Sequence, residues 1–273
     1  MVDFENEFNS ANYITLKQFQ GGWIWIKNIK ETTSRILPLL EKLSVKEIQK
    51  IADILNGAVM PWHIFDDTEW VLRLSPLPGF IILYIFNNDE EFGSALKIFF
   101  HKSSIKVPTE DAYVWTQYFL DFLGIFAKGG TEKAISTQYQ DELISFHELL
   151  EEIDPINKKK MWNDIIGQRE APLLKINQKT AEQISIQLKV SFFTGNWEEI
   201  QIQWGFKFEL LKSFNIYIVL SIDGTKVNIY YTKNVLNFQS RRILFFTWLY
   251  CNAIIREARL IMGDTLPKLS EYL

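Results

Sequence analysis

A strand-rich pattern occurs twice along the chain, and this repeat restricts the fold more than any other feature of the sequence. In residues 69–126, two apolar runs flank a turn and lead into a stretch with helical spacing. In residues 200–255, two apolar runs again flank a turn and again precede a helical stretch. Because an internal repeat corresponds to one structural unit per copy, the sequence predicts two similar modules.

We predict an α+β protein in which two similar helix–antiparallel three-strand–helix modules pack together, related by a pseudo-twofold internal repeat. Residues 1–130 are expected to form the first module with an N-terminal extension, and residues 179–273 the second. Residues 131–178 are rich in charge and contain two prolines, so we expect them to form a helical connector.

The first half of the chain contains several local signals. Residues 23–26 alternate Trp and Ile and predict a short strand. A helix is expected from Thr32 or Thr33 onwards, although Pro38 is unfavourable inside it. Residues 44–47 fit a capping box and predict a helix that ends at Asn-Gly, residues 56–57.

In the second half, helices are predicted near residues 140–153 and 178–188. Residues 238–262 are apolar on nearly every side of a helix. A helix of this kind is normally buried, so we expect it to lie between the modules or against a partner chain.

Aromatic residues are unusually frequent, with 21 Phe, 10 Tyr and 9 Trp among 273 residues. A large aromatic core in a β-rich protein explains this frequency, because these side chains bury the most area and favour strands. The alternative is that some of them line a pocket or an interface, and Trp70 and Trp204 are candidates for ligand contact. Trp197 and Trp204, which flank one strand, could line a groove or pack on a sheet face.

The totals disfavour several classes of function. The net charge is −4, which gives no basic surplus for nucleic acid. The only cysteine, Cys251, lies in an apolar run and is expected to be a buried free thiol. The start of the chain lacks the pattern of a signal peptide, and the longest apolar run, about thirteen residues, is too short to span a membrane. We therefore expect a cytoplasmic protein.

Carboxylates are the main candidates for chemistry. Asp89, Glu90 and Glu91 lie on a predicted hairpin turn, and Asp66 and Asp67 precede a strand that could pair beside it. Converging carboxylates can bind a metal or raise one another's pKa values, but a solvated turn is the simpler interpretation.

The histidines and the known sequence motifs indicate no further site. His63 could act as a lone ligand or base, and none of the three histidines has the local spacing of a metal site. The chain contains no GxSxG, Walker-type or GxGxxG motif, so the common nucleophile and phosphate sites are missing. The pairs Gly21-Gly22 and Gly129-Gly130 are isolated and do not change this.

The segment from about residue 21 to 126 resembles domain-of-unknown-function family 3786, which occurs mainly in anaerobic bacteria and archaea. The residues that carry the resemblance are Trp23, Asn56-Gly57, Asp66 or Asp67 before Trp70, Leu77-Pro78, residues 89–92, residues 98–100 and residues 108–111. His101 stands where the family usually has an acidic residue, and the amino-terminal region of the family has no evident counterpart. The resemblance implies a cytoplasmic setting and no catalytic residues. The second module looks like a further diverged copy.

The sequence thus favours a non-catalytic protein that binds a small molecule or a protein partner, a homodimer included, but neither nucleic acid nor a membrane. One alternative is an enzyme with a carboxylate site assembled from Asp66, Asp67, Asp89, Glu90 and Glu91. Another is a cofactor-handling accessory protein that holds a flat ligand between aromatic residues. The sequence identifies no cofactor and no metal.

Overall fold

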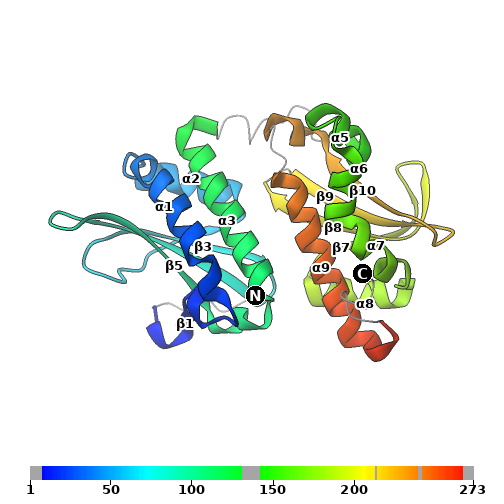
Figure 1. Ribbon diagram of the computed structural model, residues 1–273, viewed down its shortest axis with the longest axis horizontal. Coiled ribbons are helices and arrows are strands. Elements are labelled where there is room, and N and C mark those ends of the chain that lie inside the picture. The colour runs from blue at the N-terminus through cyan, green and yellow to red at the C-terminus, as the bar shows by residue number, and fades with distance from the viewer. Residues whose placement is uncertain (1–7, 131–141, 213, 239–241, 267–273) are drawn as a thin grey trace. The chain divides into compact units, whose positions relative to one another are not determined.

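The computed structural model describes residues 8–130, 142–212, 214–238 and 242–266. The chain divides into two compact units, Met1–Ile135 and Ser136–Leu273. Each unit contains one five-stranded antiparallel sheet and its own helices (Figure 1). The predicted α+β class with two similar sheet modules is therefore confirmed, whereas the expectation of three strands per module is wrong.

The first unit begins with short elements and ends with a long helix. Its strands are β1 (Tyr13–Ile14), β2 (Ala58–Met60), β3 (Thr68–Leu77), β4 (Phe80–Asp89) and β5 (Gly93–His101). Its helices are η1 (Ser10–Asn12), η2 (Leu16–Gln18), η3 (Gly22–Trp25), α1 (Ile26–Leu40), α2 (Val45–Ile54), η4 (Lys102–Lys106), α3 (Thr109–Ile125) and η5 (Phe126–Gly130).

The second unit has a similar order of elements. Its strands are β6 (Leu143–Ser145), β7 (Ser191–Trp197), β8 (Ile200–Leu211), β9 (Phe214–Ser221) and β10 (Val227–Thr232). Its helices are α5 (Phe146–Ile153), α6 (Lys158–Trp162), η6 (Asn163–Gly167), α7 (Gln168–Leu174), α8 (Gln178–Leu188), η7 (Lys233–Phe238), α9 (Arg242–Met262) and η8 (Gly263–Thr265).

The two sheets have the same topology. The strand order is β1-β5-β4-β3-β2 in the first sheet and β6-β10-β9-β8-β7 in the second. In each unit the first strand therefore pairs with the last one, β1 with β5 and β6 with β10. The sequence repeat covers only the three long strands, because strands of two or three residues such as β1 and β6 carry too little periodicity to be recognised.

The residue pairing within the sheets is also equivalent. Trp70 lies opposite Phe86, and Trp204 lies opposite Leu220. A register irregularity precedes each of these tryptophans, between Thr68 and Trp70 and between Ile202 and Trp204. Matching irregularities in matching places indicate that the two sheets share one plan of pairing and not only one strand order.

Helices cover one face of the first sheet, where α1 and α3 lie (Figure 1). On this face the hydroxyl of Tyr84 in β4 donates to the carbonyl oxygen of Thr116 in α3 at 3.1 Å. The opposite face is covered by a smaller cluster that includes Tyr13, Trp62, Val71 and Leu83. Burial on both faces explains why β4 is apolar along nearly its whole length.

The predicted strand at residues 23–26 is wrong. Residues 23–25 belong to η3, and residue 26 is the first residue of α1. The helix therefore begins before Thr32, and it ends at Leu40. Trp25 stacks on Tyr113 of α3 with a centroid distance of 4.3 Å, and Ile29, Thr32 and Ile36 follow it on the buried side. Helical spacing of buried residues over four turns outweighs the alternation of four residues.

Residues 142–178 lie within the second unit, where β6 completes the sheet. Part of the predicted connector, residues 131–141, lies outside the described residues, and so do residues 239–241 before α9. The predicted helix at 140–153 is shorter than expected, because β6 occupies Leu143–Ser145 and α5 starts only at Phe146. In the second unit, α9 packs against α7 and α8.

Candidate functional site

The first unit has a cavity of about 510 Å³ between helix α1 and strand β5, which we call the α1–β5 cavity. Its volume is within the range of small-ligand sites, roughly 300–1,000 Å³. The apolar residues that line it are Leu16, Ile26, Ile29, Leu37, Ala95, Leu96, Ile98 and Phe100. The polar and charged residues that line it are Thr15, Lys17, Lys30, Thr33, Ser34 and Ser94.

The length of β1 explains why there is space beside β5. Strand β1 pairs with β5 only at two positions, Tyr13 with His101 and Ile14 with Phe100. The chain then leaves the sheet and enters η2, so that β1 does not continue alongside residues 94–98. Among the residues that the structure describes, this part of β5 is consequently the outer edge of the sheet, and α1 packs near it.

Two glycines shape the wall formed by η2. Gly21 has φ +73°, a left-handed conformation that glycine adopts without cost. At Gly22, an added Cβ atom would lie 1.9 Å from the carbonyl oxygen of Leu16. Only glycine allows this approach between η3 and η2, so the Gly21-Gly22 pair positions Leu16 in the cavity wall.

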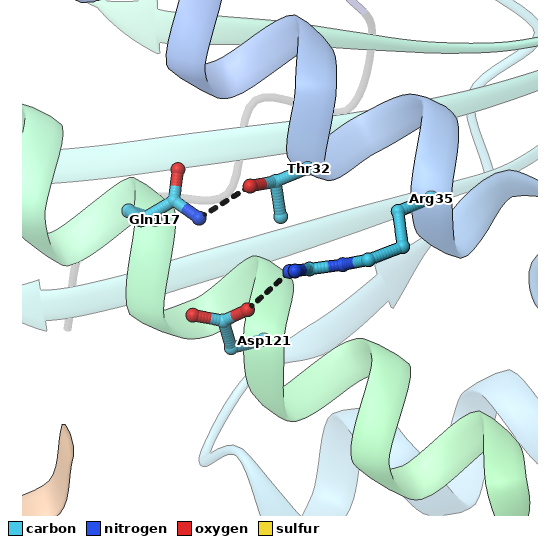
Figure 2. Close-up of polar contacts among 4 residues, drawn as sticks. All are labelled: Thr32, Arg35, Gln117 and Asp121. Carbon is cyan, nitrogen blue, oxygen red and sulfur yellow. Dashed lines mark hydrogen bonds and ion pairs between the residues drawn. The ribbon is translucent and has the colours of Figure 1, made fainter. Parts of the chain in front are cut away.

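Helix α1, the other wall, is fixed to α3 by two polar contacts (Figure 2). Arg35 Nη2 lies 2.9 Å from Asp121 Oδ1, and Gln117 Nε2 donates to Thr32 Oγ1 at 2.6 Å. Figure 2 shows these side chains reaching across from the two helices. The Arg35 side chain is 61% exposed, so its ion pair orients the helices more than it stabilises them.

The charged side chains that line the cavity are both positive. Lys17 and Lys30 are exposed at its rim, and neither has a carboxylate partner among the described residues. Lys27, one helical turn before Glu31, differs because its Nζ lies 3.9 Å from the Glu31 carboxylate. The cavity thus combines an apolar interior with unneutralised positive charge at the rim.

In the second unit, aromatic side chains pack at the counterpart of Phe100. Tyr231 of β10 corresponds to Phe100 of β5. Phe100 pairs with Ile14 of the short strand β1, and Tyr231 pairs with Ile144 of the short strand β6. Phe146 of α5 packs near Tyr231 with a centroid distance of 6.3 Å and also contacts Trp162 of α6 at 5.3 Å. An aromatic ring of the helix after the first strand thus lies near the second unit's counterpart of Phe100.

The structure places two of the predicted carboxylates in local hydrogen bonds. Asp67 Oδ1 accepts from Asn87 Nδ2 at 2.6 Å. Asp89 Oδ1 accepts from the backbone amides of Glu91 and Phe92 at 2.8 and 2.7 Å, which stabilises the β4–β5 turn. These carboxylates thus have structural partners of their own.

The other predicted polar residues are exposed. Asp66, Glu90, Glu91 and His63 all have solvent-accessible side chains. No group of three or more His, Cys, Asp or Glu residues in the described part of the chain is arranged to hold a metal ion.

The two candidate tryptophans lie in the core. Trp70 is 3% exposed and stacks on Phe86, with a centroid distance of 5.2 Å. Trp204 is fully buried, and its Nε1 donates to the carbonyl oxygen of Ile176 at 2.7 Å. Both rings contribute to packing on the helical face of their sheets.

Cys251 is a buried free cysteine, as predicted. Burial raises the pKa of its thiol to about 12, so the reactive thiolate is strongly disfavoured at neutral pH. None of the helices in the described residues is long and apolar enough to cross a membrane.

Sequence reasoning missed the cavity residues Lys17 and Lys30. Each is a single lysine in a polar stretch, and no motif distinguishes it from a solvated surface residue. The only available signal was Gly21-Gly22, which marks a close backbone approach between η3 and Leu16, the residue before Lys17.

The protein thus has two topologically equivalent α+β units, and its first unit has an apolar cavity with a basic rim. Residues 4–121 match the family described as Domain of unknown function (DUF3786), which confirms the resemblance over residues 21–121 and extends it towards the N-terminus to residue 4. The match lies within the first unit and does not extend to the second. Neither the comparison with curated proteins nor that with solved structures gives a match.

Proposed function

We propose that the first unit binds a small ligand with an apolar body and an anionic group in the α1–β5 cavity. The observation that carries the proposal is the lining of this cavity, which is apolar inside and has Lys17 and Lys30 as its charged residues.

The two parts of the lining have different roles in the proposed binding. Burial of apolar ligand surface supplies most of the affinity, at about 25 cal/mol per Å². An exposed ion pair contributes only about 0–1 kcal/mol, so each lysine selects for negative charge more than it strengthens binding.

The test is titration with the anionic dye 1-anilinonaphthalene-8-sulfonate, followed by fluorescence. Lys17→Gln and Lys30→Gln are expected to weaken dye binding about twofold to fivefold each, as predicted for exposed charge pairs. Lys27→Gln is the matched control, because Lys27 lies on the same helix but does not line the α1–β5 cavity. It should leave binding unchanged.

A filled variant tests the location. Thr33→Leu with Ile98→Phe adds apolar volume from both walls, and both changes suit their elements, a helix and a strand. We expect this variant to keep its thermal midpoint and to lose dye binding. Unchanged dye binding in the filled variant, with the fold intact, would show that the dye binds elsewhere and would contradict the proposal.

The remaining expectations from the sequence stay predictions. They are a protein partner, a homodimer, a cytoplasmic location, and the alternatives of a carboxylate enzyme or a cofactor-handling accessory. The hydrogen bonds of Asp67 and Asp89 give the enzyme alternative no support, since the atoms they use are already engaged within the fold.

A further inference from the structure

We infer that the ligand of the α1–β5 cavity is a short extended peptide with acidic side chains, which pairs with the free edge of β5. This inference rests on the proposed function and specifies the chemistry of its ligand. It depends on the coincidence of three features at one place, namely an unpaired strand edge, an apolar cavity and a group of lysines.

The free edge supplies backbone hydrogen-bonding groups. Among the described strands, β4 pairs with β5 along its whole length on one side, whereas β1 pairs on the other side only at Phe100 and His101. Along residues 94–98, alternate backbone N–H and C=O groups therefore point outwards. An added strand can use these groups, which is the mechanism of peptide recognition by strand addition.

The cavity supplies side-chain specificity. Leu96, Ile98 and Phe100 alternate along β5 and all three line the cavity. Because side chains of neighbouring strands alternate in step, every second residue of an added peptide would point into the same apolar space. A ligand without a repeating backbone would use the cavity but would not need the edge.

The lysines favour acidic residues in such a peptide. Lys17 and Lys30 lie at the cavity rim, and Lys97 lies on the opposite face of β5, with its Nζ 3.8 Å from the centre of the Phe65 ring. Acidic side chains on either face of the peptide could therefore approach a lysine. The acidic turn at residues 89–91 lies at one end of β5 and would repel acidic residues placed there.

The experiment uses the full chain and the probe peptide acetyl-Val-Glu-Val-Glu-Val-amide, whose glutamates lie on the side of Lys97 when its valines enter the cavity. Binding is measured by displacement of the dye and by direct calorimetry. The charge-reversed peptide, acetyl-Val-Lys-Val-Lys-Val-amide, is the control and should bind at least tenfold more weakly. Single N-methylation is then applied at each peptide bond in turn. Methylation should weaken binding about fivefold to tenfold at every second amide of the peptide, because only these amides face β5. Methylation of the amides between them should have little effect.

Amide hydrogen exchange provides the second measurement. Bound acidic peptide should slow exchange at alternate amides of residues 94–98, whereas the dye should not. Peptide binding that is indifferent to N-methylation at every position would overturn strand pairing but leave the cavity proposal intact. Dye binding without any peptide binding would likewise overturn strand pairing and leave the cavity proposal intact. Failure of both dye and peptide to bind would overturn the proposed function itself.

Discussion

At the scale of single residues, Gly22 is the position where the cavity wall depends most directly on one side chain. Gly22→Ala would place a methyl group 1.9 Å from the Leu16 carbonyl oxygen, so η2 and η3 must move apart. We expect a loss of about 1–3 kcal/mol in the free energy of unfolding, measured by urea denaturation, together with weaker dye binding.

The neighbouring glycine provides the control for this prediction. Gly21 has space for a side chain but a positive φ, a conformation that asparagine tolerates. Gly21→Asn should therefore stay close to the wild-type protein in both stability and dye binding. Equal stability of Gly22→Ala and the wild type would show that the close approach is not required.

The residue scale is also where the sequence was least informative. Cys251 was predicted correctly as a buried thiol, because its apolar surroundings in the chain are also its surroundings in the fold. The cavity residues were not predictable, because Lys17, Lys30 and Ile98 belong to three different elements, η2, α1 and β5, which come together only in the folded unit.

At the scale of elements, the contact between α1 and α3 includes a hydrogen bond whose contribution can be measured. Thr32→Val should lower the free energy of unfolding by about 1–2 kcal/mol, because Gln117 Nε2 loses its acceptor in a partly buried place. Gln117 Oε1 is already buried without a hydrogen-bond partner among the described residues. Gln117→Leu in the Thr32→Val background should therefore recover most of the loss, since it removes both unsatisfied groups.

Thr32→Ser keeps the hydroxyl group and serves as the control, with stability expected close to the wild type. If the double variant Thr32→Val with Gln117→Leu were less stable than Thr32→Val alone, the Gln117 amide would be stabilising through other contacts. With the single variant Gln117→Leu added, chemical denaturation of the wild type, the two single variants and the double variant completes a double-mutant cycle.

Elements with strong local signals were predictable, and short ones were not. The capping box at Ser44 was recognised from sequence, and Glu47 Oε2 accepts from the Ser44 amide at 2.8 Å as expected. The long strands β3, β4, β8 and β9 were recognisable because they are long and apolar. Strands β1, β2 and β6 have two or three residues each, and their pairing with distant strands decides their structure.

At the scale of the whole molecule, the two units repeat more than the order of their strands. The left-handed residue that follows the helix before the second strand is Asn56 in one unit and Lys189 in the other. After each first strand, a side chain three residues on accepts from a backbone amide, Gln18 from Thr15 and Glu148 from Ser145. The repeat was visible in the sequence for the long strands, whereas this local detail required the structure.

A last prediction concerns the pH dependence of stability for the whole molecule. Burial raises the pKa values of Tyr84, Tyr231, Tyr250 and Cys251, the last from 9.0 to about 12. The folded state therefore keeps protons that the unfolded chain releases, so the stability contributed by these four groups is fully present below about pH 9 and is lost as the pH rises further. Each such group contributes a slope of up to about 1.4 kcal/mol per pH unit between its two pKa values.

Cys251→Ala isolates one of these groups. Between pH 9 and pH 11, its free energy of unfolding should fall less steeply than that of the wild type, as measured by urea denaturation. Ile255→Val, which trims a buried residue on the same helix, should lower stability equally at all pH values and leave the slope unchanged. Identical slopes for Cys251→Ala and the wild type would mean that the thiol titrates normally in the folded protein, and that its burial between α9 and the sheet is incomplete.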